Sequence, residues 1–169
     1  MSELTARATD WEHRLSYALP LFGHRNWIVV ADAAYPAQSS GGIETICTGA
    51  EQVHVLRRVI DAIADARHIR ANNYVDYELQ FVSESDAPGV ASYRRELELL
   101  MANSVVNRIP HEQIIARLDQ SAQVFRILIL KTELSIPYTS VFFELDCGYW
   151  GQEEEERLRE AIVQSNTSE

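Results

Sequence analysis

Apolar side chains recur along the chain at two spacings, one typical of amphipathic helices and the other of buried strands. Intervals of three and four residues predict a helix that begins at Thr9, which with Glu12 has the spacing of a capping box, and that stops at Gly23. Its predicted buried face consists of Trp11, Leu15, Ala18, Leu19 and Phe22. A second and stronger amphipathic pattern predicts a helix over residues 50–69.

Compact apolar runs bounded by polar residues predict the strands. The clearest run covers residues 27–32. Other strands are predicted at 43–47, 74–82, 104–109, 124–130 and 141–145, the last two joined by a short turn around Pro137. Further helices are predicted at 93–101, 110–121 and 152–164. Because strands alternate with helices, the pattern favours a single α/β domain with a central sheet flanked by helices.

The amino-acid composition excludes several classes of protein and of binding partner. Of the 169 residues, 46% are apolar and 24% are charged, close to the averages for soluble globular domains. A net charge of −10 argues against nucleic acid as a partner, and no apolar run approaches the roughly 20 residues of a membrane-spanning helix. Cys47 and Cys147 lack a CxxC spacing and the N-terminus lacks the pattern of a signal peptide, so we expect reduced thiols in a cytoplasmic protein.

The densest group of chemically active side chains surrounds the strand at 27–32. His24 precedes this strand, and Asp32 ends it ahead of a loop rich in hydroxyl, amide and glycine groups. Ligands of open α/β sheets bind beyond the carboxyl ends of the strands, where Asp32 is expected, and a histidine titrates near neutral pH. The alternative interpretation makes Asp32 a loop anchor and His24 a histidine satisfied at a helix end.

A geometric constraint applies to His24 and Asp32 together. Eight residues of extended strand span about 26 Å, so one small ligand cannot contact both side chains of the same chain. Either the backbone curls at Arg25 and Asn26, or a second subunit supplies the missing group.

Two further stretches are polar within apolar surroundings. His111 and Glu112 open a predicted helix, and Tyr138, Thr139 and Ser140 precede a predicted strand. Turn and capping chemistry alone accounts for such residues. The remaining histidines and carboxylates are too scattered for a metal site, and no P-loop, dinucleotide fingerprint or nucleophile elbow is present, so no metal or cofactor is expected.

The order of these stretches resembles the ribose pyranase/fucose mutarotase (RbsD/FucU) family. The opening resemblance lies in a Gly-His pair, a strand, Asp-Ala, an aromatic-Pro-Ala and a Ser-rich loop at residues 23–42. His-Glu-Gln at 111–113 and Pro-Tyr-Thr-Ser at 137–140 continue it, and it extends from about residue 11 to 150. Ser140 stands where the family carries Asn, and residues 151–169 extend beyond the usual end of the family.

The resemblance implies an RbsD-like fold and an enzyme that interconverts ring or anomeric forms of a free monosaccharide without a cofactor. It implies His24 as the proton donor, with Asp32, His111, Tyr138, Thr139 and Ser140 binding the sugar. It also implies a ring-shaped homo-oligomer, a pentamer or decamer, with sites at subunit contacts. Residues 1–150 would form this domain and 151–169 an acidic helical extension.

Two other functions are compatible with the same residues. One is a non-catalytic monosaccharide-binding or regulatory protein on the same fold, which the Ser140 replacement favours. The other is an isomerase or lyase that acts on a different small polyhydroxylated or carbonyl substrate.

Overall fold

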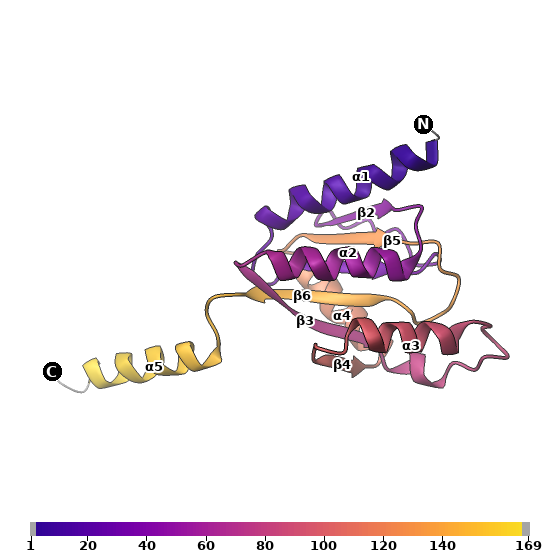
Figure 1. Cartoon of the computed structure of the whole chain (residues 1–169). Coiled ribbons are helices and arrows are strands. Elements are labelled where there is room, and N and C mark those ends of the chain that lie inside the picture. The colour runs from indigo at the N-terminus through magenta and orange to yellow at the C-terminus, as the bar shows by residue number, and fades with distance from the viewer. Residues whose placement is uncertain (1–2, 167–169) are drawn as a thin grey trace.

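Six strands form one sheet in the order β2-β5-β1-β6-β3-β4 in a computed structural model that describes residues 3–166, with side chains from residue 10 onward (Figure 1). The strands are β1 (Trp27–Ala31), β2 (Ile43–Cys47), β3 (Ile69–Asp76), β4 (Val106–Ile109), β5 (Ile127–Lys131) and β6 (Val141–Cys147). β6 runs antiparallel to both of its neighbours, β1 and β3, whereas the other neighbouring pairs are parallel. The carboxyl ends of the parallel strands therefore meet the start of β6 at one edge of the sheet, called the carboxyl edge here; the opposite edge is the amino edge.

Helices cover the two faces of the sheet unequally. They are α1 (Glu3–Ala18), η1 (Leu19–Leu21), α2 (Gln52–Asp65), η2 (Tyr77–Phe81), α3 (Val90–Leu100), α4 (His111–Ala122) and α5 (Gln152–Asn166), of which η1 and η2 are short 3-10 helices. One core cluster joins the sheet to α1, α2 and α3, and the second joins the opposite face to α4. None of the helices among the described residues is both long and apolar enough to cross a membrane.

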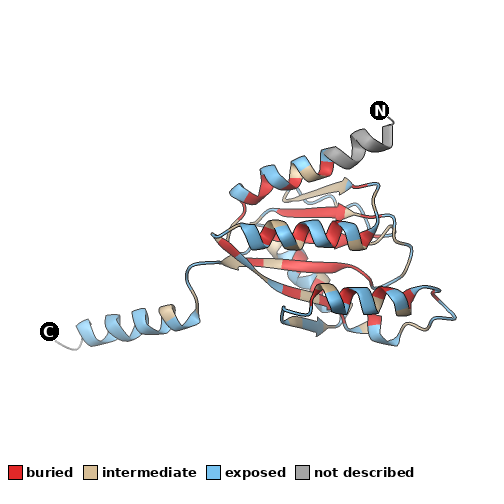
Figure 2. Ribbon diagram, viewed as in Figure 1, coloured by how far each residue is buried: buried red, intermediate tan, exposed pale blue. Residues whose placement is uncertain are grey.

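The strands β1 and β5 are buried in the centre of the sheet because they consist mainly of apolar residues. All five residues of β1 are buried, as are the first four of β5, and both strands consist almost entirely of large or β-branched apolar side chains. Figure 2 shows β5 and most of β6 in red at the buried centre of the fold. Each fully buried large apolar side chain stabilises the folded state by about 1.5–3 kcal/mol relative to an exposed one, so this centre fixes the register of the sheet.

The structure confirms the predicted single α/β domain with helices flanking a sheet, and it corrects several boundaries. The helix predicted over 50–69 ends at Asp65, and the strand predicted over 74–82 lies at Ile69–Asp76, followed by η2. Pairing with the whole of β6 decides this register, because Ile69 is opposite Cys147 and Val75 is opposite Val141. Local alternation alone does not contain that information.

Two other predictions differ from the structure. Helix α1 begins at Glu3, so Thr9 lies within the helix and is not its N-cap. The strands β5 and β6 are not a hairpin, because β1 lies between them in the sheet and residues 132–140 cross its carboxyl edge.

Helix α5 lies apart from the domain. It leaves the amino edge after β6 and extends away from the sheet, and none of its residues is buried (Figures 1 and 2). Ion pairs between residues four positions apart lie along the helix, such as Arg159 Nε to Glu155 Oε1 at 2.7 Å. The helix therefore contributes charge and apolar side chains to the surface without contributing to the core.

We expect a chain truncated after Trp150 to keep its fold. Because α5 buries no side chain, its removal should change the free energy of unfolding by less than about 0.5 kcal/mol, measured by urea denaturation. A loss of unfolding free energy several times larger than this, measured on proteins in the same association state, would contradict this placement of α5.

Candidate functional site

A cavity of about 620 Å³ opens at the carboxyl edge of the sheet. Its walls come from the loop after β1, the end of β3, the first turns of α4 and the loop before β6. The polar side chains that line it are Asp32, Tyr35, Gln38, Asp76, His111, Glu112, Ser135 and Tyr138. The structure thus brings together Asp32, His111 and Tyr138, three of the residues expected to bind the sugar.

Asp32 organises the loop that follows β1. Its carboxylate accepts a hydrogen bond from the Ala34 amide at 2.9 Å, and its own amide donates to Ser140 Oγ at 3.3 Å. The loop anchor suggested as an alternative from sequence is therefore one role of Asp32, and its place in the cavity wall is another.

Thr139 and Ser140 lie behind the cavity wall. Both side chains are buried, and neither residue lines the cavity. Thr139 Oγ1 donates to the Ile136 carbonyl at 2.7 Å, and the Thr139 carbonyl accepts hydrogen bonds from the Tyr93 hydroxyl at 2.6 Å and from the Gln52 amide. Their hydrogen bonds hold the loop before β6 in place.

Tyr138 projects from that loop toward α4. Its φ of 58° lies in the left-handed region, which residues other than glycine rarely adopt, and the surrounding hydrogen bonds hold it there. The Tyr138 ring meets the His111 ring edge-on, with 5.7 Å between centroids. The loop conformation therefore places an aromatic surface beside the imidazole in the cavity.

Asp76 holds His111 from the end of β3. Asp76 Oδ1 lies 3.0 Å from His111 Nδ1, and Glu78 accepts a hydrogen bond from the His111 amide at 3.0 Å. Burial raises the pKa of Asp76 to about 6, with smaller contributions from Glu78 and Asp32, while His111 acts in the opposite direction. This carboxyl group consequently titrates in a range where it is able to exchange protons near neutral pH.

The cavity contains buried polar atoms without partners. Within the described residues, the buried side-chain atoms that lack a hydrogen-bond partner are Tyr35 Oη, Gln38 Oε1 and Asp76 Oδ2. All three residues line this cavity. Buried polar groups in proteins are usually hydrogen-bonded, so three unpartnered atoms on residues that line one cavity indicate a site for a ligand rich in hydrogen-bonding groups.

His24 belongs to a different cluster, at the amino edge. His24 Nδ1 lies 2.7 Å from Asp146 Oδ1, and Arg70 Nη2 lies 2.8 Å from Asp146 Oδ2. Although partial burial opposes it, hydrogen bonds from Arg70, the Cys147 amide and His24 lower the pKa of Asp146. The His24 ring remains more than half exposed, at 57% of its side-chain surface.

The length of β1 separates His24 from the cavity. Its five residues alone span about 16 Å of extended chain. The backbone does turn at Arg25, where φ is 72°, and the turn is closed by a hydrogen bond from the Asn26 amide to the Gly23 carbonyl. This turn directs His24 toward Asp146, so the structure does not bring His24 and Asp32 of one chain together.

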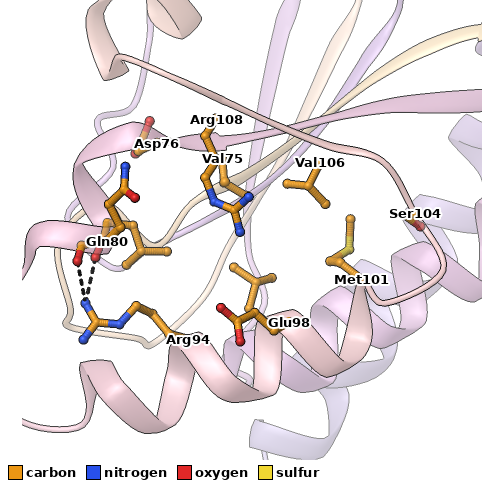
Figure 3. A pocket seen from close by; sticks show the side chains of 11 residues that line it. Val75, Asp76, Gln80, Arg94, Glu98, Met101, Ser104, Val106 and Arg108 are labelled. Atoms are coloured by element: carbon orange, nitrogen blue, oxygen red, sulfur yellow. Dashed lines mark hydrogen bonds between the residues drawn. The ribbon is translucent and has the colours of Figure 1, made fainter.

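A second, smaller cavity lies on the opposite face of the sheet. It encloses about 240 Å³ between the ends of β3 and β4 and helix α3. In Figure 3, Glu98 and Arg108 point into it, whereas Asp76 stands at its rim. Val75 belongs to the core on this face and successive strand residues alternate, so the Asp76 side chain points toward α4 and the larger cavity.

Sequence reasoning missed Asp76, Glu78 and the Asp146–Arg70 pair. The strand predicted at 74–82 placed Asp76 and Glu78 in the middle of a strand, although Asp76 in fact ends it. A carboxylate directly after an apolar strand residue was the available signal. No group of three or more His, Cys, Asp or Glu side chains suited to a metal ion occurs in the described part of the chain.

Comparison with known proteins shows the family of the chain and solved structures with a similar fold. The model of the RbsD / FucU transport protein family matches residues 11–144. The fold is similar to that of Bacillus subtilis RbsD complexed with D-ribose, at 16% identity and a TM-score of 0.53 over 79% of this chain and 91% of that one.

Two further solved structures are similar, and curated proteins give no match. FucU from Bifidobacterium longum has 13% identity and a TM-score of 0.50, over 79% of this chain and 94% of that one. The fucose mutarotase of Streptococcus pneumoniae, in complex with L-fucose, has 19% identity and a TM-score of 0.48, over 77% of this chain and 89% of that one.

We expect Asp76→Asn to gain stability relative to the wild type as the pH rises. A carboxyl whose pKa is raised in the folded state contributes stability that is present below pH 4 and is lost as the pH rises to about 6. Asparagine has no charge to bury, so between pH 4 and pH 8 the difference in unfolding free energy should shift by roughly 2 kcal/mol in favour of the variant. Urea denaturation at both pH values measures it, and a difference independent of pH would contradict the burial of an ionised Asp76.

Proposed function

The chain belongs to the RbsD/FucU family, and we propose that it interconverts ring or anomeric forms of a free monosaccharide by acid/base ring opening without a cofactor. The observation that carries this proposal is the set of three unpartnered buried polar atoms, which belong to residues in the wall of a cavity lined by carboxylates, phenols and an imidazole. Sugar hydroxyls both donate and accept hydrogen bonds, so they are suited to such a mixed set of groups.

The charge of the cavity favours a sugar without phosphate. Its lining includes the carboxyl groups of Asp32, Asp76 and Glu112, and it includes no lysine or arginine. Phosphate-binding sites use such cations or helix N-termini to balance the charge of the ligand. The helix N-terminus in this cavity, that of α4, carries Glu112 in its first turn, and its His111 amide already donates to Glu78. The substrate we propose is accordingly ribose-like or fucose-like and unphosphorylated.

Ring opening of a hemiacetal needs one group to protonate the ring oxygen and a second to take the proton of the anomeric hydroxyl. We assign the first role to His24. Because His24 and the cavity lie at opposite edges of the sheet, His24 must come from a second copy of the chain whose amino edge faces this carboxyl edge. Asp32, His111 and Tyr138 bind the sugar from the first copy, and Thr139 and Ser140 support them through the loop before β6.

Contact between two different edges is heterologous, and such contacts form rings when the rotation between neighbouring subunits closes. We therefore propose a ring-shaped homo-oligomer, a pentamer or decamer, with a site at each subunit contact. Residues 1–150 make up the sugar-binding domain, and residues 151–169 are an acidic extension outside it. The free cysteines, Cys47 and Cys147, are consistent with a cytoplasmic enzyme.

One observation favours a second candidate, a monosaccharide-binding protein without catalytic activity. Ser140 replaces the asparagine of the family, and its hydroxyl is buried against the Asp32 amide. Such a protein would bind the sugar without accelerating its exchange.

We expect the wild type to accelerate exchange between the ring forms of ribose, fucose or a related aldose, measured by NMR exchange spectroscopy. His24→Ala should reduce that acceleration at least about 100-fold, the usual contribution of a general acid. A His54→Ala variant is the matched control, since His54 is a half-exposed histidine outside both clusters. Binding of a sugar without accelerated exchange would establish the second candidate, and full activity of His24→Ala would refute the assignment of His24.

Mixing two inactive variants tests the shared site. His24→Ala and Asp32→Asn each remove one half of every site, so each alone should be inactive. In a randomly mixed ring of equal amounts, about a quarter of the contacts combine an intact His24 with an intact Asp32. We expect co-expressed chains to recover about that fraction of wild-type exchange. If a site lay within one chain, co-assembly would recover none.

A further inference from the structure

We infer that His111 is the second proton-transfer group of this site and that Asp76 is its positioning residue. The inference rests on the proposed function and extends it, because it gives His111 a catalytic role beyond sugar binding and assigns a role to Asp76. It is carried by the geometry of four groups: the buried Asp76 carboxyl, the His111 ring, the Glu78 carboxylate and the Tyr138 ring.

The hydrogen bond that Asp76 accepts from His111 determines which ring nitrogen of His111 carries the proton. An ionised carboxylate only accepts hydrogen bonds, so Asp76 Oδ1, at 3.0 Å from His111 Nδ1, requires that nitrogen to be the donor. In the neutral ring the other nitrogen, Nε2, then carries the free lone pair. A histidine held in this way by a carboxylate is prepared to act as a general base through its second nitrogen.

The position of the ring is fixed on its other sides. Glu78 accepts the His111 amide hydrogen and so ties the start of α4 to the segment after β3. The Tyr138 ring packs edge-on against the imidazole at 5.7 Å between centroids. With 32% of its side chain exposed, the His111 ring remains accessible to a ligand in the cavity it lines.

Asp76 is suited to hold His111 because it is itself immobile. Its side chain is only 1% exposed, and Oδ2 lacks a hydrogen-bond partner. The ionisable groups that act on it are Asp32 and Glu78, which disfavour its ionisation, and His111, which favours it. Tyr35 approaches from the loop after β1, and Arg108 of β4 points into the second cavity instead (Figure 3). An imidazolium formed at His111 is therefore the cation that balances the Asp76 charge.

The proton transfers balance without an oxidant or reductant. His111 Nε2 takes the proton of the anomeric hydroxyl, and the electron pair of that O–H bond forms the carbonyl bond. The bond between the anomeric carbon and the ring oxygen breaks, its electron pair stays on the ring oxygen, and that oxygen takes a proton from His24 of the second copy. When the ring closes on either face of the carbonyl, the attacking hydroxyl returns its proton to His24, and His111 gives its proton to the carbonyl oxygen, which becomes the new anomeric hydroxyl.

Asp76→Asn tests the inference through the separation of kcat from KM. The amide has the volume of the carboxyl but not its charge, so it stabilises an imidazolium poorly. We expect kcat for sugar exchange to fall at least about 10-fold, with KM changed less than about three-fold. The acid limb of the kcat profile should move to lower pH, because the neighbouring negative charge that favours an imidazolium at His111 is lost.

Two further variants separate positioning from mere packing. Asp76→Glu keeps the charge. Compared with Asp76→Asn, it should recover part of kcat and return the acid limb of the kcat profile toward its wild-type pH. Glu98→Gln is the matched control, because it neutralises a carboxylate that points into the other cavity, and it should leave both kcat and the profile unchanged. An Asp76→Asn enzyme with wild-type kcat and acid limb, beside an active wild type, would refute the inference and leave the proposed function standing.

A spectroscopic measurement tests the geometry independently of activity. In ¹⁵N NMR of the histidine-labelled wild type at pH 8, His111 should show the tautomer with the proton on Nδ1. In Asp76→Asn the fraction of that tautomer should fall. A wild-type His111 with its proton on Nε2 would overturn the inference even if the protein exchanges sugars.

Discussion

The antiparallel strand β6 is the element on which the arrangement of this molecule depends. It joins two groups of parallel strands, β2-β5-β1 and β3-β4, by pairing with β1 on one side and β3 on the other. At its start, the loop that enters β6 brings Tyr138 to His111 and supports Asp32 through Ser140. At its end, Asp146 binds His24 and Arg70. One strand therefore builds a polar cluster at each edge of the sheet.

The two clusters are chemically unequal, and the difference follows from burial. The carboxyl-edge cluster contains a carboxyl that is almost fully buried and three polar atoms without partners, all of which cost stability in the unliganded protein. The amino-edge cluster is more exposed, and the hydrogen bonds of Asp146 are saturated by Arg70, His24 and its neighbouring amide. The first has the character of a binding cavity, and the second that of a group presented to a partner.

The sequence predicted those elements whose apolar residues form the core. The buried strand β1 follows from its short length and β-branched composition, and the amphipathic helix α2 from its helical periodicity. The position of β3 could not be predicted in this way, because pairing with β6 selects Ile69–Asp76 against the alternation at 74–82. The local sequence pattern also could not predict how β5 connects to β6, since that connection depends on β1 lying between them in the sheet.

Some residues of the candidate site were also predicted from the sequence, and others were not. Asp32 was found from its place directly after a strand, whereas the resemblance to the RbsD/FucU family selected His111 and Tyr138, and the structure brings all three together. Asp76 was missed because the strand that it ends was placed too late. The sequence also indicated the separation of His24 from Asp32, since it follows from the length of β1 alone. Where His24 points depends on Asp146, a residue 122 positions away in the chain.

A crystal structure of the protein with ribose or fucose bound tests the central claim, that two copies of the chain build one sugar site. We expect the sugar in the cavity formed by Asp32, His111 and Tyr138, with His24 of a second copy at hydrogen-bond distance, about 3 Å, from a sugar oxygen. A sugar bound in that cavity with every His24 beyond the reach of a single bridging water would contradict the claim.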